Sequence, residues 1–238
     1  MKALYKKELQ FYVNNPIGYI VIILFAVFAN FLFVKDIFVL GSASLRPFFD
    51  ILPWLMMVFI PALTMRTLSE EKKNNTLEVL LSLRVSETQL VLAKFLALLT
   101  MVGIGLLLTV SLPFSLHFLT SNAGSKVYIP EFLTGYLGEL LLAAAFIAIS
   151  MFYSSQTKNQ VVAFLLSVIT LFFLIVSSTD FIAGVLPRFI YDFVTYMSPV
   201  TQISNFLKGV LDLRSIYYFL SFTIIFLLLT IIDLERRP

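Results

Sequence analysis

The chain has 238 residues, of which 59% are hydrophobic and 13% are charged, and its mean hydropathy is +0.94. Soluble domains carry about 25% charged residues, so this composition excludes a soluble globular protein and predicts one all-α polytopic membrane domain over residues 1–238. The basic residues behind the net charge of +3 lie at the ends of apolar segments, which argues against a nucleic-acid-binding protein. The sequence has no cysteine, which excludes disulfides, thiolate metal sites and a cysteine nucleophile.

The first predicted element is an amphipathic helix over residues 1–15. Aliphatic and aromatic side chains occupy one side of it, and lysine and amide side chains occupy the other. Glu8 is the one charged residue that interrupts the apolar side. We expect this helix to lie in the membrane interface, and Pro16 to end it and turn the chain into the bilayer.

Six apolar segments follow, and we expect each of them to cross the membrane as a helix. They comprise residues 17–34, 48–66, 90–119, 133–153, 159–178 and 216–234. The first is longer than the apolar core of a signal peptide, which has about 7–15 residues, so we interpret it as an uncleaved span. The third is longer than a bilayer requires, and Pro113 is expected to kink it or to mark its outer end.

The distribution of Lys and Arg residues predicts the orientation of these spans. With the N-terminus in the cytoplasm, eleven of the 17 basic residues fall on the inner side and the other six on the outer side. This excess favours N- and C-termini that are both cytoplasmic. It also places the loop of residues 67–89 in the cytoplasm.

A short helix over residues 76–83 is predicted within that loop, after the charged cluster Glu70-Glu71-Lys72-Lys73. Asn75 and Glu78, three residues apart, form a pair that is typical of a helix start. Three leucines of the helix share one face, namely Leu77, Leu80 and Leu81.

A second capping box, Ser86 with Gln89, opens the third span. Two caps so close together favour a rigid lever on which a soluble partner pushes. The alternative is an ordinary solvated loop whose leucines dip into the membrane interface, and the pattern leaves both open. Pro61 removes a helix hydrogen bond shortly before the loop and is a candidate hinge.

Residues 179–215 are too apolar for an ordinary loop, yet charged residues and prolines interrupt them. A single span carrying those charges would be costly. We expect a re-entrant hairpin of two short helices, provided that protein covers its irregular backbone. A pair of interfacial amphipathic helices fits the pattern equally well.

Glu139 lies about two turns inside the fourth span, where a carboxylate is expensive. We predict that it lines a substrate route or pairs with a basic residue near the outer face. The alternative is that the span begins later and Glu139 sits among the outer headgroups.

Little else in the sequence is suited to chemistry. No G-x-x-x-x-G-K-[ST] loop is present, so any ATPase must be another polypeptide. The lone histidine, His117, excludes His-rich metal sites and an H-E-x-x-H motif. We therefore predict no catalytic, cofactor-binding or metal-binding residue in this chain.

Several short blocks, in order along the chain, resemble the permease subunits of type-2 ABC transporters, and among these the gliding-motility-associated branch of bacterial permeases. The blocks are Lys6-Lys7-Glu8, Asn15-Pro16-Ile17-Gly18-Tyr19, Pro53-Trp54, Pro61-Ala62-Leu63-Thr64-Met65-Arg66, Glu70-Glu71-Lys72-Lys73, Thr76-x-Glu78-x-Leu80-Leu81, Lys94-Phe95, Ser198-Pro199, Gly209-Val210-Leu211-Asp212 and Tyr217-Tyr218-Phe219. Together they extend over most of the chain.

The resemblance implies that residues 1–15 are an elbow helix and residues 76–83 a coupling helix, which docks in a cleft of a separate ATP-binding subunit. The implied coupling residues are Glu70, Glu71, Asn75, Thr76, Leu77, Glu78, Leu80 and Leu81. Two copies of the ATPase would bind ATP and Mg. A second copy of this chain, or a sister permease, would enclose the substrate route in the bacterial inner membrane, with a companion periplasmic or membrane protein as a further partner.

Three positions depart from the family pattern. Asn75 replaces a glycine, Arg84 replaces a proline, and Ala93 replaces a glycine. Asn adopts a left-handed or capping conformation nearly as well as glycine, whereas loss of the proline makes the turn before the third span less rigid. These departures concern the coupling geometry.

We therefore expect a non-catalytic permease half of an ATP-driven transporter. One alternative keeps the fold but transmits movement to envelope or periplasmic machinery without moving a solute. A second alternative, a membrane-embedded lipid-modifying enzyme, requires clustered acids, histidines or a metal motif at the membrane surface. The only acidic cluster, Glu70-Glu71, is followed directly by two lysines.

Overall fold

The computed structural model describes residues 1–40, 45–76, 86–111, 113–115, 129–177, 187, 191 and 194–235. These residues form the helices α1 (Lys2–Asn14), α2 (Pro16–Leu40), α3 (Arg46–Thr64), α4 (Ser69–Lys73), α6 (Glu87–Thr109), α8 (Ile129–Gln156), α9 (Gln160–Val176), α12 (Pro199–Phe206) and α13 (Leu213–Glu235). No strand occurs within those ranges.

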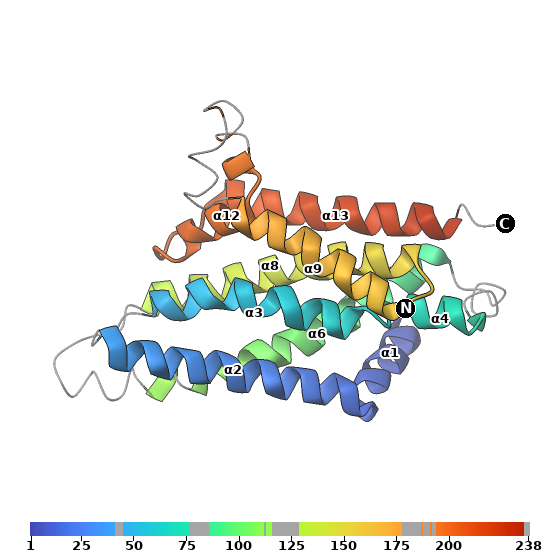
Figure 1. The fold of residues 1–238 in the computed structure, drawn as a ribbon, viewed down its shortest axis with the longest axis horizontal. Coiled ribbons are helices and arrows are strands. Elements are labelled where there is room, and N and C mark those ends of the chain that lie inside the picture. Colours follow the sequence, from blue (N-terminus) through green and yellow to red (C-terminus); the bar gives the residue numbers. More distant parts are fainter. Residues whose placement is uncertain are drawn as a thin grey trace.

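The long helices lie side by side along the long axis of the molecule (Figure 1). Helix α8 is central, because it contacts α3, α6, α9, α12 and α13. Its apolar stretch is 61% buried within the chain, against 33% for those of α2 and α13. Helices α1 and α4 and the end of α13 lie at one end of the bundle, here called the α1 end, and α12 lies at the other (Figure 1).

Five helical stretches are long and apolar enough to cross a membrane, and they correspond to five of the six predicted spans. They are Pro16–Lys35, Arg46–Lys73, Glu87–Ser115, Ile129–Gln156 and Leu213–Glu235. The sixth predicted span, 159–178, is the shorter apolar helix α9 with 17 residues. That length is at the lower limit for a bilayer, about 17–25 residues. The prediction of an all-helical polytopic membrane protein is confirmed.

The turn between α1 and α2 forms where the sequence predicts it. Asn15 is extended, with φ −89° and ψ 125°, as expected for a residue before proline, and Pro16 begins α2. Two residues later, a Cβ atom on Gly18 would lie 2.2 Å from the carbonyl oxygen of Tyr12. Only glycine therefore allows α2 to leave α1 at this angle.

Two helix ends differ from the predicted spans. Helix α2 continues to Leu40, past the expected end at residue 34. The regular helix α6 ends at Thr109, where the N–H of Val110 donates to the Leu107 carbonyl, although the apolar helical stretch runs on to Ser115; residues 116–119 of the predicted span lie outside the described residues. Pro113 has no N–H to offer the carbonyl of Thr109, which explains why the regular helix stops there.

The first half of the predicted re-entrant segment 179–215 lies mostly outside the described residues, which include 187, 191 and 194–215. Its described part includes α12, whose backbone carbonyl at Phe206 accepts a hydrogen bond from the Thr134 hydroxyl of α8 at 2.6 Å. Gly138 of α8 also faces the Phe206 ring, since a Cβ there would lie 3.0 Å from it. Helix α12 is therefore packed closely against the centre of the bundle.

Candidate functional site

Three helices meet in a buried ionic cluster at the α1 end. Lys94 of α6 lies with its Nζ 2.6 Å from Oε1 of Glu71 in α4 and 3.1 Å from Oε2 of Glu8 in α1. The Lys94 side chain is only 2% exposed, Glu8 is 6% exposed and Glu71 is 18% exposed. We call these three residues the Lys94 cluster.

The burial of Lys94 follows from the position of α6. The neighbouring side chains Leu90, Val91, Ala93 and Leu98 are all buried, so the lysine is carried into the bundle with them. A buried charge is tolerated when it is paired and hydrogen-bonded, and here two carboxylates from different helices supply the partners. Removing one member of such a set typically costs about 3–5 kcal/mol.

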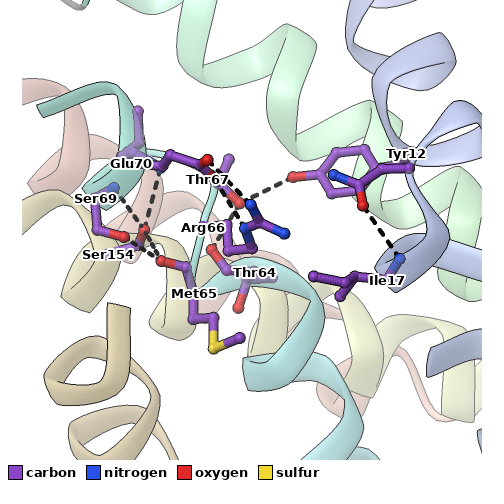
Figure 2. Close-up of polar contacts among 11 residues, drawn as sticks. Tyr12, Ile17, Thr64, Met65, Arg66, Thr67, Ser69, Glu70 and Ser154 are labelled. Carbon is purple, nitrogen blue, oxygen red and sulfur yellow. Dashed lines mark hydrogen bonds and ion pairs between the residues drawn. The ribbon is translucent and has the colours of Figure 1, made fainter. Parts of the chain in front are cut away.

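Helix α1 is also held by a tyrosine. The Tyr12 hydroxyl is 3.0 Å from Oγ1 of Thr67, in the connection between α3 and α4. Burial raises the pKa of Tyr12 to about 12, so the phenol remains protonated and neutral at physiological pH. The contact between Tyr12 and Thr67 (Figure 2) and the Lys94 cluster together fix α1 to the stretch that carries α4.

The break between α3 and α4 is held by Ser154 of α8. Its hydroxyl donates to the Met65 carbonyl at 3.1 Å and accepts from the backbone N–H groups of Leu68 at 3.1 Å and Ser69 at 3.2 Å (Figure 2). A serine hydroxyl has one proton and two acceptor sites, so Ser154 makes every hydrogen bond that its side chain can make. Helix α8 thus sets the direction in which α4 leaves α3.

Two further ion pairs position α4. Arg66 donates from Nε and Nη2 to both carboxylate oxygens of Glu70, at 2.8 and 3.0 Å. Lys72, whose side chain is 3% exposed, lies 3.4 Å from Asp233 near the end of α13. The five residues of α4 are therefore connected to α6 and α1 on one side and to α8 and α13 on the other.

A cavity of about 440 Å³ lies beside the Lys94 cluster, with walls from α1, α4 and the connection before α4. Lys7, Glu8, Arg66, Glu71 and Thr76 are among its lining residues. Thr76 is the last described residue before the predicted coupling helix, and its hydroxyl donates to the Glu71 carbonyl at 3.3 Å. The cavity therefore connects the ionic cluster with the start of that segment.

The predicted coupling residues fall into two groups. Glu70 and Glu71 form part of α4, and the polar network above includes both. Asn75 has a positive φ of 55° directly after α4, the left-handed conformation that usually requires glycine or asparagine at a helix end. The remaining predicted coupling residues lie outside the described residues, namely Leu77, Glu78, Leu80 and Leu81.

Ser86 is the N-cap of α6, as the predicted capping box requires, because the N–H of Gln89 donates to the Ser86 hydroxyl at 3.3 Å. Pro61 lies buried within α3, where it leaves the Met57 carbonyl without its usual helical donor. Its role as a hinge stays a prediction.

Sequence reasoning did not bring Glu8 and Lys94 together. Each residue is nevertheless unusual in its own sequence context. Glu8 interrupts the apolar side of the first helix, and Lys94 lies four residues inside a predicted span, where an ionisable side chain is unusual. The buried face of α1 in fact contains Glu8 and Tyr12, whereas Phe11 is 47% exposed.

Glu139 is fully buried in α8, with an exposed fraction of 0%. Neither carboxylate oxygen has a hydrogen-bond partner among the described residues. The side chain does not reach the surface of the bundle, which argues against the headgroup position. Contact with a substrate would therefore require the helices around it to separate.

Within the described residues, no group of three or more His, Asp or Glu side chains is arranged to hold a metal ion. His117 lies outside those residues. The polar groups at the α1 end bind one another across helix boundaries, as Lys94 with Glu8 and Glu71, and Lys72 with Asp233.

Comparison with protein families decides the class. The family model described as "ABC-2 family transporter protein" matches residues 2–235. The chain belongs to the ABC-2 transporter family. A comparison with curated proteins gives no match.

The ABC-2 match agrees with the five apolar helices long enough to cross a membrane. This ABC-2 protein is accordingly a multi-pass transmembrane protein of an ABC transporter family, consistent with a permease subunit. ABC-2 permeases are generally non-catalytic membrane components and work with ATP-binding subunits. The connections of α4 to α1, α6, α8 and α13 can therefore be considered as those of a membrane component that works with an ATP-binding subunit.

Proposed function

We propose that this ABC-2 protein is the permease subunit of an ATP-driven transporter and forms half of a translocation pathway that a separate ATPase drives. The observation that supports this best is the Lys94 cluster, which joins α4 to α6 and α1 through buried ion pairs. In this proposal the α1 end faces the cytoplasm of a bacterial cell, and residues 76–83 dock on the ATPase.

The proposed complex contains two ATP-binding subunits, which bind ATP and Mg. A second copy of this chain, or a sister permease, completes the pathway. Lipids cover the apolar outer faces of α2 and α13, where side chains such as Phe31 and Tyr217 are 66% and 71% exposed. A companion periplasmic or membrane protein would complete the assembly.

Movement would pass through α4 in two directions. A displacement of the coupling segment pulls on Glu71, and the 2.6 Å contact with Lys94 carries that displacement to α6. On the other side, Ser154 and the Lys72–Asp233 pair carry it to α8 and α13. Buried pairs of this kind resist separation because a lone buried charge is costly, so the connected helix ends move together.

Two residues singled out from the sequence, Pro61 in α3 and Glu139 in α8, have roles in this proposal. Pro61 would allow the α4 end of α3 to bend, since its missing N–H weakens the helix there. Glu139 would reach the substrate route when α3 and α8 separate. Glu139→Gln would then alter both transport and substrate-stimulated ATP hydrolysis.

The resemblance of the sequence blocks to the gliding-motility-associated branch supports a second candidate function. In it the same helices transmit ATP-driven movement to envelope or periplasmic machinery without moving a solute. Measuring substrate flux and ATP hydrolysis together in proteoliposomes separates the two, because only the transporter couples hydrolysis to flux.

The test uses the cysteine-free chain, which accepts single labels without background. Leu107 is 70% exposed on α6 and lies far from the α1 end, so a spin label at Leu107→Cys reports movement between two copies. With the ATPase bound, ATP should change the label-to-label distance. The double reversal Glu71→Lys with Glu78→Lys should abolish this change but leave membrane insertion intact.

Glu87→Lys is the matched control, because Glu87 lies in the first turn of α6 outside the cluster. An unchanged ATP response in the double variant would exclude the proposed coupling. Labelling of Thr76→Cys from the outer side of intact cells would exclude the proposed orientation.

A further inference from the structure

Glu139 is a buried acid that the Lys94 cluster does not involve. Its side chain is 0% exposed, and both carboxylate oxygens lack a hydrogen-bond partner among the described residues. Buried polar groups in proteins are almost always hydrogen-bonded, and an exception requires an explanation.

The face of α8 that carries Glu139 packs against α3. Gly135 precedes Glu139 by four residues and therefore lies on the same face of the helix. A Cβ atom on Gly135 would lie 2.5 Å from the Phe49 ring of α3. The next residue of α3, Asp50, interacts electrostatically with Glu139. Glu139 thus lies at the contact between α3 and α8, in the half of the bundle away from the α1 end.

No described cation neutralises Glu139 at this contact. Arg46 is the basic residue of α3, and it interacts electrostatically with two other acids, Asp50 and Glu131. Helices α9 and α12 carry no ionisable side chain. In α6 and α4 the charged residues lie at the α1 end. Arg214 and two tyrosines lie in the first turns of α13, and α8 itself contributes Glu131 and Tyr136.

An ionised Glu139 would therefore be buried, without a hydrogen-bond partner among the described residues, and repelled by Asp50. Burying an unpaired carboxylate costs at least several kcal/mol, and such a group takes up a proton instead. The protonated acid is also a hydrogen-bond donor. Helix α3 offers an acceptor in the same region, because Pro53 has no N–H and leaves the Phe49 carbonyl without its helical donor.

We propose that Glu139 binds a proton at the contact between α3 and α8 and releases it when these helices separate. Binding forms one O–H bond on the carboxylate of Glu139, with the proton taken from water at the end of the bundle away from α1. Release returns that proton to water admitted between the helices. The binding step is independent of the proposed function, whereas the release step rests on it, because release requires ATP-driven movement of the helices.

Infrared spectroscopy of the purified protein in lipid nanodiscs tests the binding step. At neutral pH the wild-type protein should show the carbonyl band of a protonated carboxylic acid, and Glu139→Gln should lack it. Glu131→Gln should retain the band and serves as the matched control at the same end of α8. Absence of the band from the wild type, or its persistence in Glu139→Gln, would overturn the assignment.

Isotope labelling of the wild type keeps the test valid if Glu139→Gln does not fold. Glutamate with a ¹³C carboxyl group should shift the band, and aspartate labelled in the same way should leave it in place. A shift with labelled aspartate alone would assign the proton to an aspartate instead and contradict the proposal.

The release step is tested on the complex with the ATPase trapped in its ATP-bound form. The band should disappear on trapping and return when the nucleotide is removed. The release step would be refuted if the carbonyl band persisted while the ATPase was bound and the spin labels on α6 had moved. An ATPase that does not bind would instead contradict the proposed function, and the two failures are therefore distinguishable.

Discussion

Within the described part of the chain, buried ionisable residues are paired at the α1 end of the bundle, and Glu139 is unpaired in the opposite half. At the α1 end, Lys94 is surrounded by two carboxylates from other helices, at 2.6 and 3.1 Å. At the α3–α8 contact, Glu139 is equally buried but has no partner among the described residues. Paired charges fix helices to one another, whereas a lone acid can remain buried only by taking up a proton. The α1 end thus holds its helices together, and in our proposal Glu139 responds when α3 and α8 separate.

The largest effect is expected from breaking the paired end. Lys94→Met leaves Glu8 and Glu71 buried without a cation, which should destabilise the protein by about 3–5 kcal/mol. A lower melting temperature of the purified protein in detergent would show this. The triple variant Lys94→Met, Glu8→Gln and Glu71→Gln removes all three charges and should recover much of the stability. Equal melting temperatures for Lys94→Met and the wild type would contradict the structural role of the cluster.

A smaller loss is expected at the neighbouring serine. Ser154→Ala removes the single hydroxyl oxygen that accepts from the N–H groups of both Leu68 and Ser69, and the loss of this shared acceptor should cost about 1–3 kcal/mol in total. Thermal unfolding followed by circular dichroism measures the loss. Ser204→Ala is the control, because that hydroxyl only donates to the Thr201 carbonyl within α12. If both variants melt at the same temperature, the break between α3 and α4 does not depend on Ser154.

The smallest change in stability, and one of the opposite sign, is expected from replacing the unpaired Glu139. Glu139→Leu removes a buried polar group that has no described partner, so the stability should be unchanged or should rise by up to about 1–3 kcal/mol. The same melting experiment measures it. A loss of stability as large as that of Lys94→Met would indicate that Glu139 has an ionic partner, and the contrast between the two ends would disappear.

Sequence patterns predicted the elements that depend on neighbouring residues. The first helix, its end before Pro16 and the N-cap at Ser86 are local features, because the contacts involved span only a few positions. The class of the protein followed from composition together with the order of several short motifs. The helix ends were less accurate, and α2 runs six residues beyond the predicted end of its span.

The Lys94 cluster could not be predicted because its members are far apart in the sequence. Glu8 and Lys94 are separated by 86 positions, and Lys94 and Glu71 by 23. An isolated charge within an apolar pattern indicates that a partner is required but does not identify it. The partner depends on how α1, α4 and α6 pack, and no local pattern contains that information. The same reason left Glu139 with two open interpretations until its burial was known.

The single hydroxyl at Ser154 has a consequence for how such proteins can diverge. The orientation of α4 depends on a residue 85 positions further along the chain, which belongs to the most central helix of the bundle. A substitution in α8 can therefore change the direction of α4 without altering any residue of α4. Under the proposed function, a change at this end of α8 would adjust which ATPase fits, and sequence surveys confined to residues 67–89 would overlook it.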